Sequence, residues 1–452
     1  MQNHDTLLRR ELLTTDPQRQ HEPFPLTDVQ EAYWVGRQLA LDLGNVASHT
    51  YQEVEWPGVN LDRFTTAVNR LIQRHGMLRA VVRRDARQQV LPSVPWYEPA
   101  VIDLPGAQPQ AVNETIEALR QRMSRQVFTP ERWPLFEICA VRSGDGGTRL
   151  HVSFDLLIAD AWSLRILGRD IARLYSDPDA NLPPLEVSFR DYVLSVRALR
   201  ATAAHAEARA YWRERAGTLP GGPDLPLACH PASIAKPRFV RRSGRLDAAE
   251  WAALRATASR ARVTPSGLLL AAFADVLGRW SATPRFVVTV TLFHRIPVHA
   301  HVDEIVGDFT SLVLVEVDYS HRESLLARAR RVQERLWQDL DHRMVSGVEV
   351  LREIGRTKGR LARESIPVVF TSTLFDDPSR ARNMPAPGTE IVYGISQTPQ
   401  VWIDHQVSED TGGLAFSWDV VEGLFTSDVL DEMFADQDRL LHRLAASEGV
   451  QS

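Results

Sequence analysis

The sequence predicts an α/β protein of the α+β kind, built from two pseudo-duplicated lobes with a functional site between them. Its 452 residues correspond to roughly two or three typical domains, so more than one lobe is expected. Helical and strand-like patterns alternate along the whole chain. This periodicity breaks at residues 217–227, with a similar rhythm on either side. We therefore expect an N-terminal linker or docking tail at residues 1–22, an N-terminal lobe at 23–217 and a C-terminal lobe at 218–452.

Composition and charge exclude several classes of function. The net charge is −5 and the basic residues are scattered, so no nucleic-acid partner is expected. Cys139 and Cys229 lack CxxC spacing, which argues against a disulfide framework or a zinc site and fits a reducing cytoplasm. The longest apolar runs are far shorter than a membrane span, and the polar N-terminus has no signal-peptide core. The sequence thus predicts a cytoplasmic protein with no metal and no membrane contact.

The first half alternates between helices and strands. Thr27 with Gln30 three residues later predicts a capping box that opens a short helix. Asp62 is expected to cap a second helix, which ends at residues 75–76 before a strand at 77–82; its apolar stripe is Phe64, Ala67, Val68, Leu71 and Ile72. A helix at 112–127 and strands at 136–141 and 149–154 follow. Either Asp160 or Ser163 can cap the next helix, and residues 189–216 are expected to form one long helix.

The second half repeats this rhythm. Helices are expected at residues 248–260 and from Thr264 and Pro265 onward, because proline at the first helical position behind a threonine cap is a good start signal. Strands are expected at 286–293 and 306–317. Further helices are predicted at 324–338, 345–354 and 427–445.

Two predicted strands near the C-terminus, at residues 367–373 and 399–407, carry the candidate site. In the second strand, a period of two places Gln400, Trp402, Asp404 and Gln406 on one face. In the first strand, Val369, Thr371 and Thr373 share a face. A carboxylate and a hydroxyl on two rigid strands can share a site. The pattern alone leaves open that Asp404 is an exposed strand residue or a structural ion-pair partner.

A strand–loop–helix junction carries two more acids. Asp155 is predicted at the polar side of a strand end, and Asp160 lies five residues later in the loop. Such junctions often hold functional sites, and they equally often hold helix caps. Catalysis and architecture both remain open for these two acids.

Eight stretches occur in an order typical of one family, and together they carry a resemblance. They are FPLTDVQEAYWVGR (24–37), RHGMLRA (74–80), DLLIAD (155–160), LPGGPDLPL (219–227), TPS (264–266), VGDFT (306–310), PVVFTS (367–372) and QTPQVWID (397–404). Over about residues 24–425 the sequence resembles the heterocyclization (cyclization) domains of nonribosomal peptide synthetases. The resemblance implies two chloramphenicol-acetyltransferase-like lobes in a V shape with a central tunnel.

The resemblance also implies partners and a reaction. Donor and acceptor carrier (thiolation) domains would dock at the tunnel mouths and insert their phosphopantetheine arms, so the domain needs no cofactor of its own. An adenylation domain would be adjacent. The acceptor amine of Cys, Ser or Thr would attack the donor thioester, and its side chain would then close a thiazoline or oxazoline ring with loss of water. A domain that only condenses, or one that only docks carriers, remains an alternative.

Roles for individual residues follow from the same resemblance. Related condensation domains carry a His-His-x-x-x-Asp-Gly motif, and Leu156 occupies the second histidine position here, so that histidine cannot act. Dehydration needs a positioned acid or base, for which Asp404 is the candidate, with Thr371 orienting it. Ser372 and Gln400 are expected to be supporting contacts. We expect Arg295 to pair with Asp160 across the lobes as a structural ion pair. His294 stands where the family pattern has asparagine.

Overall fold

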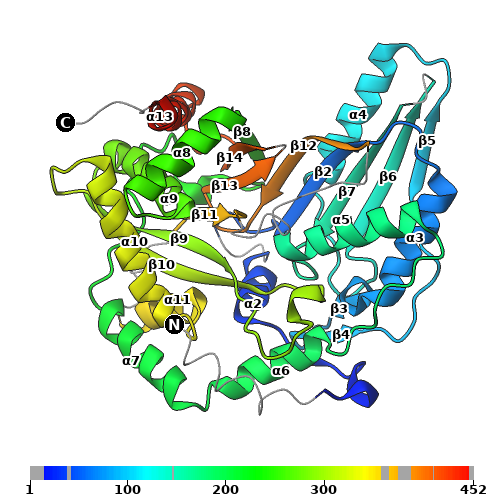
Figure 1. Ribbon diagram of the computed structural model, residues 1–452, viewed down its shortest axis with the longest axis horizontal. Helices are drawn as coiled ribbons and strands as arrows, with labels where there is room; N and C mark the ends of the chain where they lie inside the picture. Colours follow the sequence, from blue (N-terminus) through cyan, green and yellow to red (C-terminus); the bar gives the residue numbers. More distant parts are fainter. Residues whose placement is uncertain are drawn as a thin grey trace.

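The computed structural model describes residues 15–37, 42–144, 147–357, 366–374, 388–410 and 412–446. Two large β-sheets, one in each half of the molecule, lie side by side, and helices cover their faces (Figure 1). A small third sheet of β1 (Phe24–Pro25), β4 (Arg87–Val90) and β3 (Ala80–Val82) lies under the N-terminal half. The larger hydrophobic core centres on the C-terminal sheet and extends to the α4 side of the N-terminal sheet, and a second core centres on the other face of the N-terminal sheet. The α/β class expected from the sequence is therefore confirmed.

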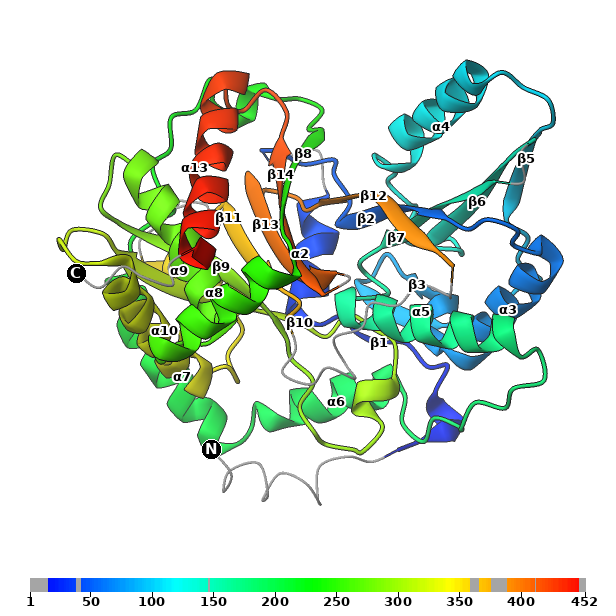
Figure 2. The ribbon, with the colours of Figure 1, turned by 45° about the horizontal axis from the view of Figure 1, so that its top comes forward.

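The N-terminal sheet has the strand order β12-β2-β7-β6-β5. Its strands are β12 (Glu390–Gln397), β2 (His49–Glu55), β7 (Thr148–Asp155), β6 (Phe136–Ser143) and β5 (Ala100–Leu104). Helices α3 (Leu61–Arg74) and α5 (Ala161–Ser176) cover one face, and α4 (Pro109–Met123) lies over the other (Figure 2). Polar and apolar side chains alternate along β7, so one face meets the helices α3 and α5 while the other carries His151, Ser153 and Asp155.

The C-terminal sheet has the strand order β10-β9-β11-β13-β14-β8. Its strands are β10 (Thr310–Asp318), β9 (Arg285–Phe293), β11 (Val368–Ser372), β13 (Ile403–Asp410), β14 (Gly413–Val421) and β8 (Phe239–Leu246). It is covered by α8 (Ala248–Arg260), α9 (Pro265–Trp280), α10 (Leu325–Asp341) and α13 (Ser427–Ala446) (Figures 1 and 2). Helix α9 is buried from Gly267 to Gly278, which explains its almost unbroken apolar sequence.

Several elements tie the two halves together. Strand β12 follows β11 in the chain but pairs with β2, so a segment of the C-terminal half completes the N-terminal sheet. Helix α2 (Asp28–Gly36) contacts both β10 and α11 (Gly347–Thr357). Gly36 lies close against Pro399, where an added β-carbon would be only 2.9 Å from the Pro399 Cβ. Helices α6 (Phe189–Leu199) and α7 (Ala203–Ala216) run beneath both halves (Figure 1).

Some local predictions are confirmed. Thr27 and Gln30 form the complete capping box at the start of α2. Thr264 caps α9 through the Gly267 N–H, with Pro265 in its first turn. Helix α8 has the bounds expected from the sequence. These signals depend on neighbours within one helical turn, which is why sequence alone identifies them.

Other local predictions are wrong. The cap of α3 is Asn60 rather than Asp62, because the Asn60 side chain accepts the Arg63 N–H. Residues 189–216 form two helices, since Thr202 caps a new helix there. The strand expected from residue 399 begins at Ile403, because the chain turns through Gln400 with a positive φ of 64°. The strand expected from residue 306 begins at Thr310.

The expected tail and lobe boundary are only partly visible. Residues 1–14 lie outside the described residues, whereas Pro17–Arg19 forms a 3-10 turn and His21 Nδ1 lies 3.0 Å from the Val90 carbonyl oxygen. The division after residue 217 stays a prediction. Within the described residues no single helix combines the length and apolarity needed to cross a bilayer; α8 and α9, bent by 94°, meet that test only as a pair.

A candidate active site between the two sheets

A cavity of about 1830 Å³ lies between the two sheets and contains the predicted site. Both lobes line it, through side chains of β2, β7, β6 and α5 on one side and of β9, β11 and β13 on the other. Strand β12 and Tyr33 of α2 close it where the lobes join. The polar residues that line it around β11 and β13 include Thr289, Thr291, Thr310, Thr371, Thr373, Asp404, Gln406 and Ser417.

Asp404 and Thr371 are brought together in this cavity. Asp404 lies on β13, beside Val369 of the parallel strand β11, and is only 6% exposed. The Gln406 side-chain amide donates to Asp404 Oδ2 at 2.8 Å. The Thr371 hydroxyl lies 3.4 Å from Asp404 Oδ1 and 3.0 Å from Thr291 Oγ1, and its single hydrogen can serve one of these acceptors at a time. The carboxyl is thus held from both sides by weak, neutral donors.

The environment of Asp404 raises the pKa of its carboxyl toward neutral pH. Burial and the negative charge of Asp419 together raise this pKa to about 6, against the lowering effects of Gln406, Arg241 and Thr371. Arg241 is already engaged, because it donates to both carboxylate oxygens of Asp419 at 2.6 Å. Arg241 Nη2 also donates to the side-chain amide oxygen of Gln406 (Oε1) at 3.2 Å. Arg241 therefore reaches Asp404 by hydrogen bonding only through Gln406, while its charge lowers the Asp404 pKa directly; the net pKa of Asp404 stays raised.

Two further titratable groups near this site were missed by the sequence reasoning. Burial raises the pKa of Asp308 to about 8, against hydrogen bonds from Thr310, whose N–H lies 3.0 Å from Asp308 Oδ1. Burial also raises the pKa of Tyr33, and the carboxyls of Asp308, Asp404 and Asp160 raise it further. Both residues lie in stretches that carry the family resemblance, FPLTDVQEAYWVGR and VGDFT, but periodicity gives no signal for the complete burial of Asp308 or for the position of half-buried Tyr33 in the cavity wall.

Asp160 and Arg295 form the ion pair that the resemblance implied. Arg295 Nη2 donates to Asp160 Oδ1 at 3.3 Å, and both side chains are almost fully buried. Asp160 also caps α5 through the Ser163 N–H at 2.7 Å and accepts the Phe309 N–H at 3.3 Å. Arg295 also donates to the carbonyl oxygens of Val302 and Ile305. These bonds occupy both carboxylate oxygens of Asp160, although it lines the cavity, so its position favours a structural role.

Asp155 is held away from the cavity. Arg37 donates to both of its oxygens at 3.1 Å, and the Leu157 N–H donates to Oδ1 at 3.0 Å. The neighbouring Leu156 side chain, at the second histidine position of related condensation domains, lines the cavity instead. The geometry of Asp155 therefore favours a structural role over a catalytic one.

The structure does not bring Ser372 and Gln400 to Asp404 as expected. Ser372 lies on the opposite side of β11, where its hydroxyl is 2.8 Å from Ser266 Oγ and lines a second cavity of about 450 Å³. Gln400 lines the main cavity from an exposed turn. Trp402, predicted on the face of Asp404, packs against the C-terminal core. His294 is buried, which lowers its pKa to about 4.

Among the described residues, no group of three or more histidine, cysteine, aspartate or glutamate side chains is arranged to hold a metal ion. The candidate site is a set of polar and titratable side chains in a cavity between two α/β lobes. That arrangement defines a class of two-lobed enzymes in which substrates meet at the lobe junction.

Comparison with known proteins identifies the family. A model of the condensation domain matches residues 20–448, and the chain belongs to the condensation-domain superfamily of nonribosomal peptide synthetases. It is 41% identical to pyochelin synthetase PchF of Pseudomonas aeruginosa over 96% of this chain, and 38% identical to phenyloxazoline synthase MbtB of Mycobacterium tuberculosis over 94%. The chain spans 24% of the first protein and 30% of the second, so it corresponds to one part of such synthetases.

Similarity to solved structures supports the same family assignment. The cyclization-docking bidomain of EpoB from Sorangium cellulosum superposes with a TM-score of 0.90 at 38% identity, covering 98% of this chain and 88% of that one. The X-domain from teicoplanin biosynthesis, at 20% identity and a TM-score of 0.76, shares the fold. The fold is accordingly the chloramphenicol-acetyltransferase-like fold of these domains, as the resemblance implied.

Proposed function

We propose that this chain is a heterocyclization domain of a nonribosomal peptide synthetase. It condenses a carrier-bound acyl donor with carrier-bound Cys, Ser or Thr, and it cyclodehydrates the product to a thiazoline or oxazoline. The observation that carries the proposal is the Asp404 carboxyl, with a pKa raised to about 6, held beside Thr371 inside a cavity open to both lobes. The similarity to PchF, MbtB and the EpoB cyclization domain supports the same reaction class.

Amide formation requires mainly positioning. The acceptor amine attacks the donor thioester carbon, the thiol of the donor phosphopantetheine arm leaves, and the amine loses a proton. Holding the two reactants together contributes about 7 to 11 kcal/mol in favourable cases, so no strong base is demanded. Leu156 in place of a histidine fits this reading, because the cavity wall offers an apolar side chain where a related domain has an imidazole.

Ring closure is the step that uses Asp404. The acceptor thiol or hydroxyl attacks the new amide carbon, and the former amide oxygen becomes a hydroxyl. That hydroxyl must then leave as water while the nitrogen loses its proton and a C=N bond forms. Asp404, ionised at neutral pH but close to its pKa, accepts one proton and delivers it to the departing oxygen. Thr371 orients the carboxyl from β11.

Donor and acceptor carrier domains are the proposed partners, with an adenylation domain adjacent in the same synthetase. Their phosphopantetheine arms supply the substrates as thioesters, and the polar cavity wall along β9, β11 and β13 offers hydroxyl and amide groups to such arms. The domain carries no cofactor of its own in this scheme.

The test is the intact mass of the product on the acceptor carrier. We expect the parent domain to yield a product lighter than the open amide by one water, and Asp404→Asn to yield the open amide with ring formation slowed about 100-fold or more. Asp431→Asn, an exposed carboxylate of α13 that pairs with Arg242 away from the cavity, is the matched control and should behave like the parent. Ring formation at the parent rate in Asp404→Asn would exclude this role. An open amide from the parent would indicate a condensation-only domain, and no product would indicate a docking domain.

A further inference from the structure

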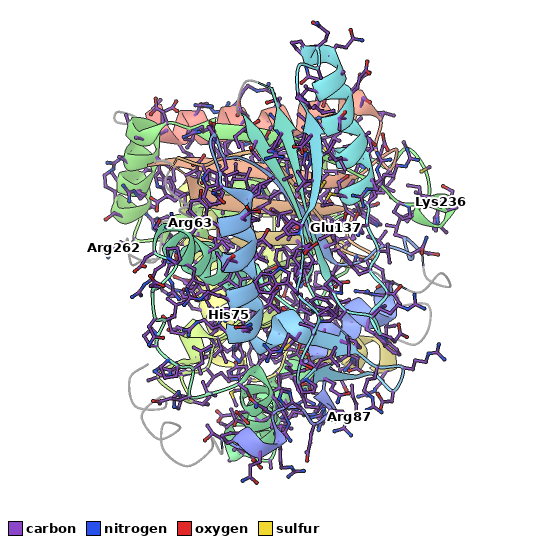
Figure 3. All side chains as sticks on the ribbon, turned by 90° about the vertical axis from the view of Figure 1, so that its right-hand side faces the viewer. Arg63, His75, Arg87, Glu137, Lys236 and Arg262 are labelled. Carbon is purple, nitrogen blue, oxygen red and sulfur yellow. The ribbon has the colours of Figure 1, made fainter. Side chains whose placement is uncertain are left out.

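The main cavity extends well beyond Asp404, into the N-terminal lobe. It continues between the sheet face of β2, β7 and β6 and the helices α3 and α5. The strand registers explain why this face is continuous: Val54 pairs with Leu150, and Val152 pairs with Ile138. All four side chains therefore project from the same side of the sheet, and all four line the cavity. Figure 3 views this lobe from outside, with Arg63 and His75 toward opposite ends of α3.

This extension is apolar and incompletely filled. We define it as the N-lobe pocket, lined by Val54, Val68, Val152, Phe154, Leu164 and Ile171. Although a sheet lies on one side and helices on the other, Val54, Val152, Phe154, Leu164 and Ile171 are only half-buried. Close packing between the sheet and helices would bury them fully. Their exposed surface thus faces the cavity and is available to an apolar ligand.

The opposite face of the same sheet is more closely packed than the N-lobe pocket. There Glu53 accepts hydrogen bonds from Arg120 and from the Tyr51 hydroxyl, and its strand neighbours Tyr51 and His151 are fully buried. Between the sheet and the helices, the charged residues that line the cavity are Asp160 and Arg165, both in or next to the first turn of α5; Glu390 lies on β12, at the edge of the sheet. A polar group deeper in the pocket would lose its hydration without gaining a partner from the apolar wall.

We propose that the N-lobe pocket binds the apolar part of the donor acyl group, an alkyl chain or an aromatic ring. This inference rests on the proposed function and names the donor class for it. The acceptor Cys, Ser or Thr has a short polar side chain that cannot fill such a space, whereas the donor acyl group is the variable reactant. The pocket is continuous with the Asp404 site, so an acyl group within it keeps its thioester in the polar part of the cavity.

A binding experiment tests the pocket independently of catalysis. S-octanoyl-pantetheine and S-acetyl-pantetheine are titrated into the full chain by calorimetry. Because each buried methylene favours binding, we expect the octanoyl compound to bind at least tenfold more tightly than the acetyl compound. Val152→Trp fills the pocket from β7 and should bring the two affinities within about twofold. Val101→Trp, the same change on the exposed strand β5, should leave the preference intact.

A second variant guards against misfolding. Ile171→Phe narrows the pocket from α5, and circular dichroism establishes that each variant retains its fold. If the octanoyl compound binds the parent no better than the acetyl compound, or if folded Val152→Trp and Ile171→Phe keep the full preference, the inference is overturned.

Turnover separates this inference from the proposed function. With carriers loaded with octanoyl or acetyl donors, Val152→Trp should lose at least tenfold in octanoyl product while changing acetyl product little. Equal losses for both donors, with product still formed, would overturn the pocket assignment and keep the proposed function. Absence of product from every donor, with the binding preference intact, would keep the pocket and overturn the proposed function.

Discussion

The acids of the N-terminal loop and the acid on β13 lie near the same lobe junction but have opposite surroundings. Asp155 and Asp160 each face a buried arginine, Arg37 and Arg295, and backbone N–H groups occupy their other lone pairs. Asp404 faces the cavity and contacts a hydroxyl and an amide. The aspartates at this junction thus differ in their partners: arginine for Asp155 and Asp160, neutral hydrogen-bond donors for Asp404.

The hydrogen-bond partners of each carboxyl distinguish structural from catalytic candidates in this fold. An arginine and backbone N–H groups that together bond both oxygens hold the carboxylate in one orientation, as in Asp155 and Asp160. Neutral donors hold the position of the carboxyl but let its pKa rise, to about 6 in Asp404. Variants of each acid should therefore separate into those that change stability and those that change chemistry.

The largest expected effect is on the Asp160–Arg295 pair. Arg295→Ala leaves the Asp160 carboxylate buried without its cation and removes the bonds to the Val302 and Ile305 carbonyls. We expect a loss of about 3 to 5 kcal/mol in the free energy of unfolding, measured by urea titration. Arg439→Ala breaks an exposed pair with Asp436 on α13 and should cost less than about 1 kcal/mol. Similar values for the two variants would contradict the structural assignment.

Asp155 is expected to give the next largest effect. Asp155→Asn removes one charge from its two-bonded contact with Arg37, which is nearly buried. The expected loss is about 2 to 3 kcal/mol in the free energy of unfolding, because the guanidinium is left without its charged partner. The ratio of ring to open amide among products should not change. If Asp155→Asn selectively lost the ring product, Asp155 would have a role in ring formation rather than a structural one.

The sequence predicted the parts of this site that depend on local pattern. Strand periodicity placed Thr371 and Thr373 on one face, and both line the cavity. The helix-cap alternatives for α5 included Asp160, which is the cap. The pairing of Asp160 with Arg295 required the family resemblance, because 135 residues separate the partners.

The remainder depended on tertiary contacts that no local pattern reports. The left-handed turn at Gln400 removed Gln400 and Trp402 from the predicted strand and left Asp404 near its start. The pairing of β12 with β2 joins segments more than 300 residues apart. The raised pKa of Asp308 results from burial on all sides, which a strand pattern cannot distinguish from burial on one side.

A third prediction concerns the effect of the raised Asp404 pKa on the free energy of unfolding. In the folded protein the pKa of Asp404 is raised from 3.8 to about 6, so ionisation favours the unfolded state. Stability is therefore greatest below pH 4 with respect to this group and is lost as the pH rises through about 6. Asp404→Asn removes this titration while keeping a side chain of the same shape. We expect the variant to exceed the parent by about 1 to 3 kcal/mol at pH 7.

The measurement is urea unfolding of parent and Asp404→Asn at pH 4, 5, 6 and 7. The difference should be small at pH 4 and should reach a plateau above pH 6. A constant difference across this range would indicate that the Asp404 pKa is not raised in the folded protein. Asp410→Asn, exposed on the same strand, supplies the baseline for removing one carboxylate.

The smallest expected effect isolates Thr371. Its hydrogen bond lowers the pKa of Asp404, so Thr371→Val should raise that pKa. Ring formation in the parent should increase as the pH rises through about 6, because the ionised carboxyl accepts the first proton. In Thr371→Val this midpoint should move to higher pH, and the plateau rate should fall about tenfold. Thr373→Val, which lines the same cavity but bonds the Val407 carbonyl, should keep the parent midpoint; a shared shift in both variants would mean that general polarity, rather than contact with Asp404, sets the proton affinity of the site.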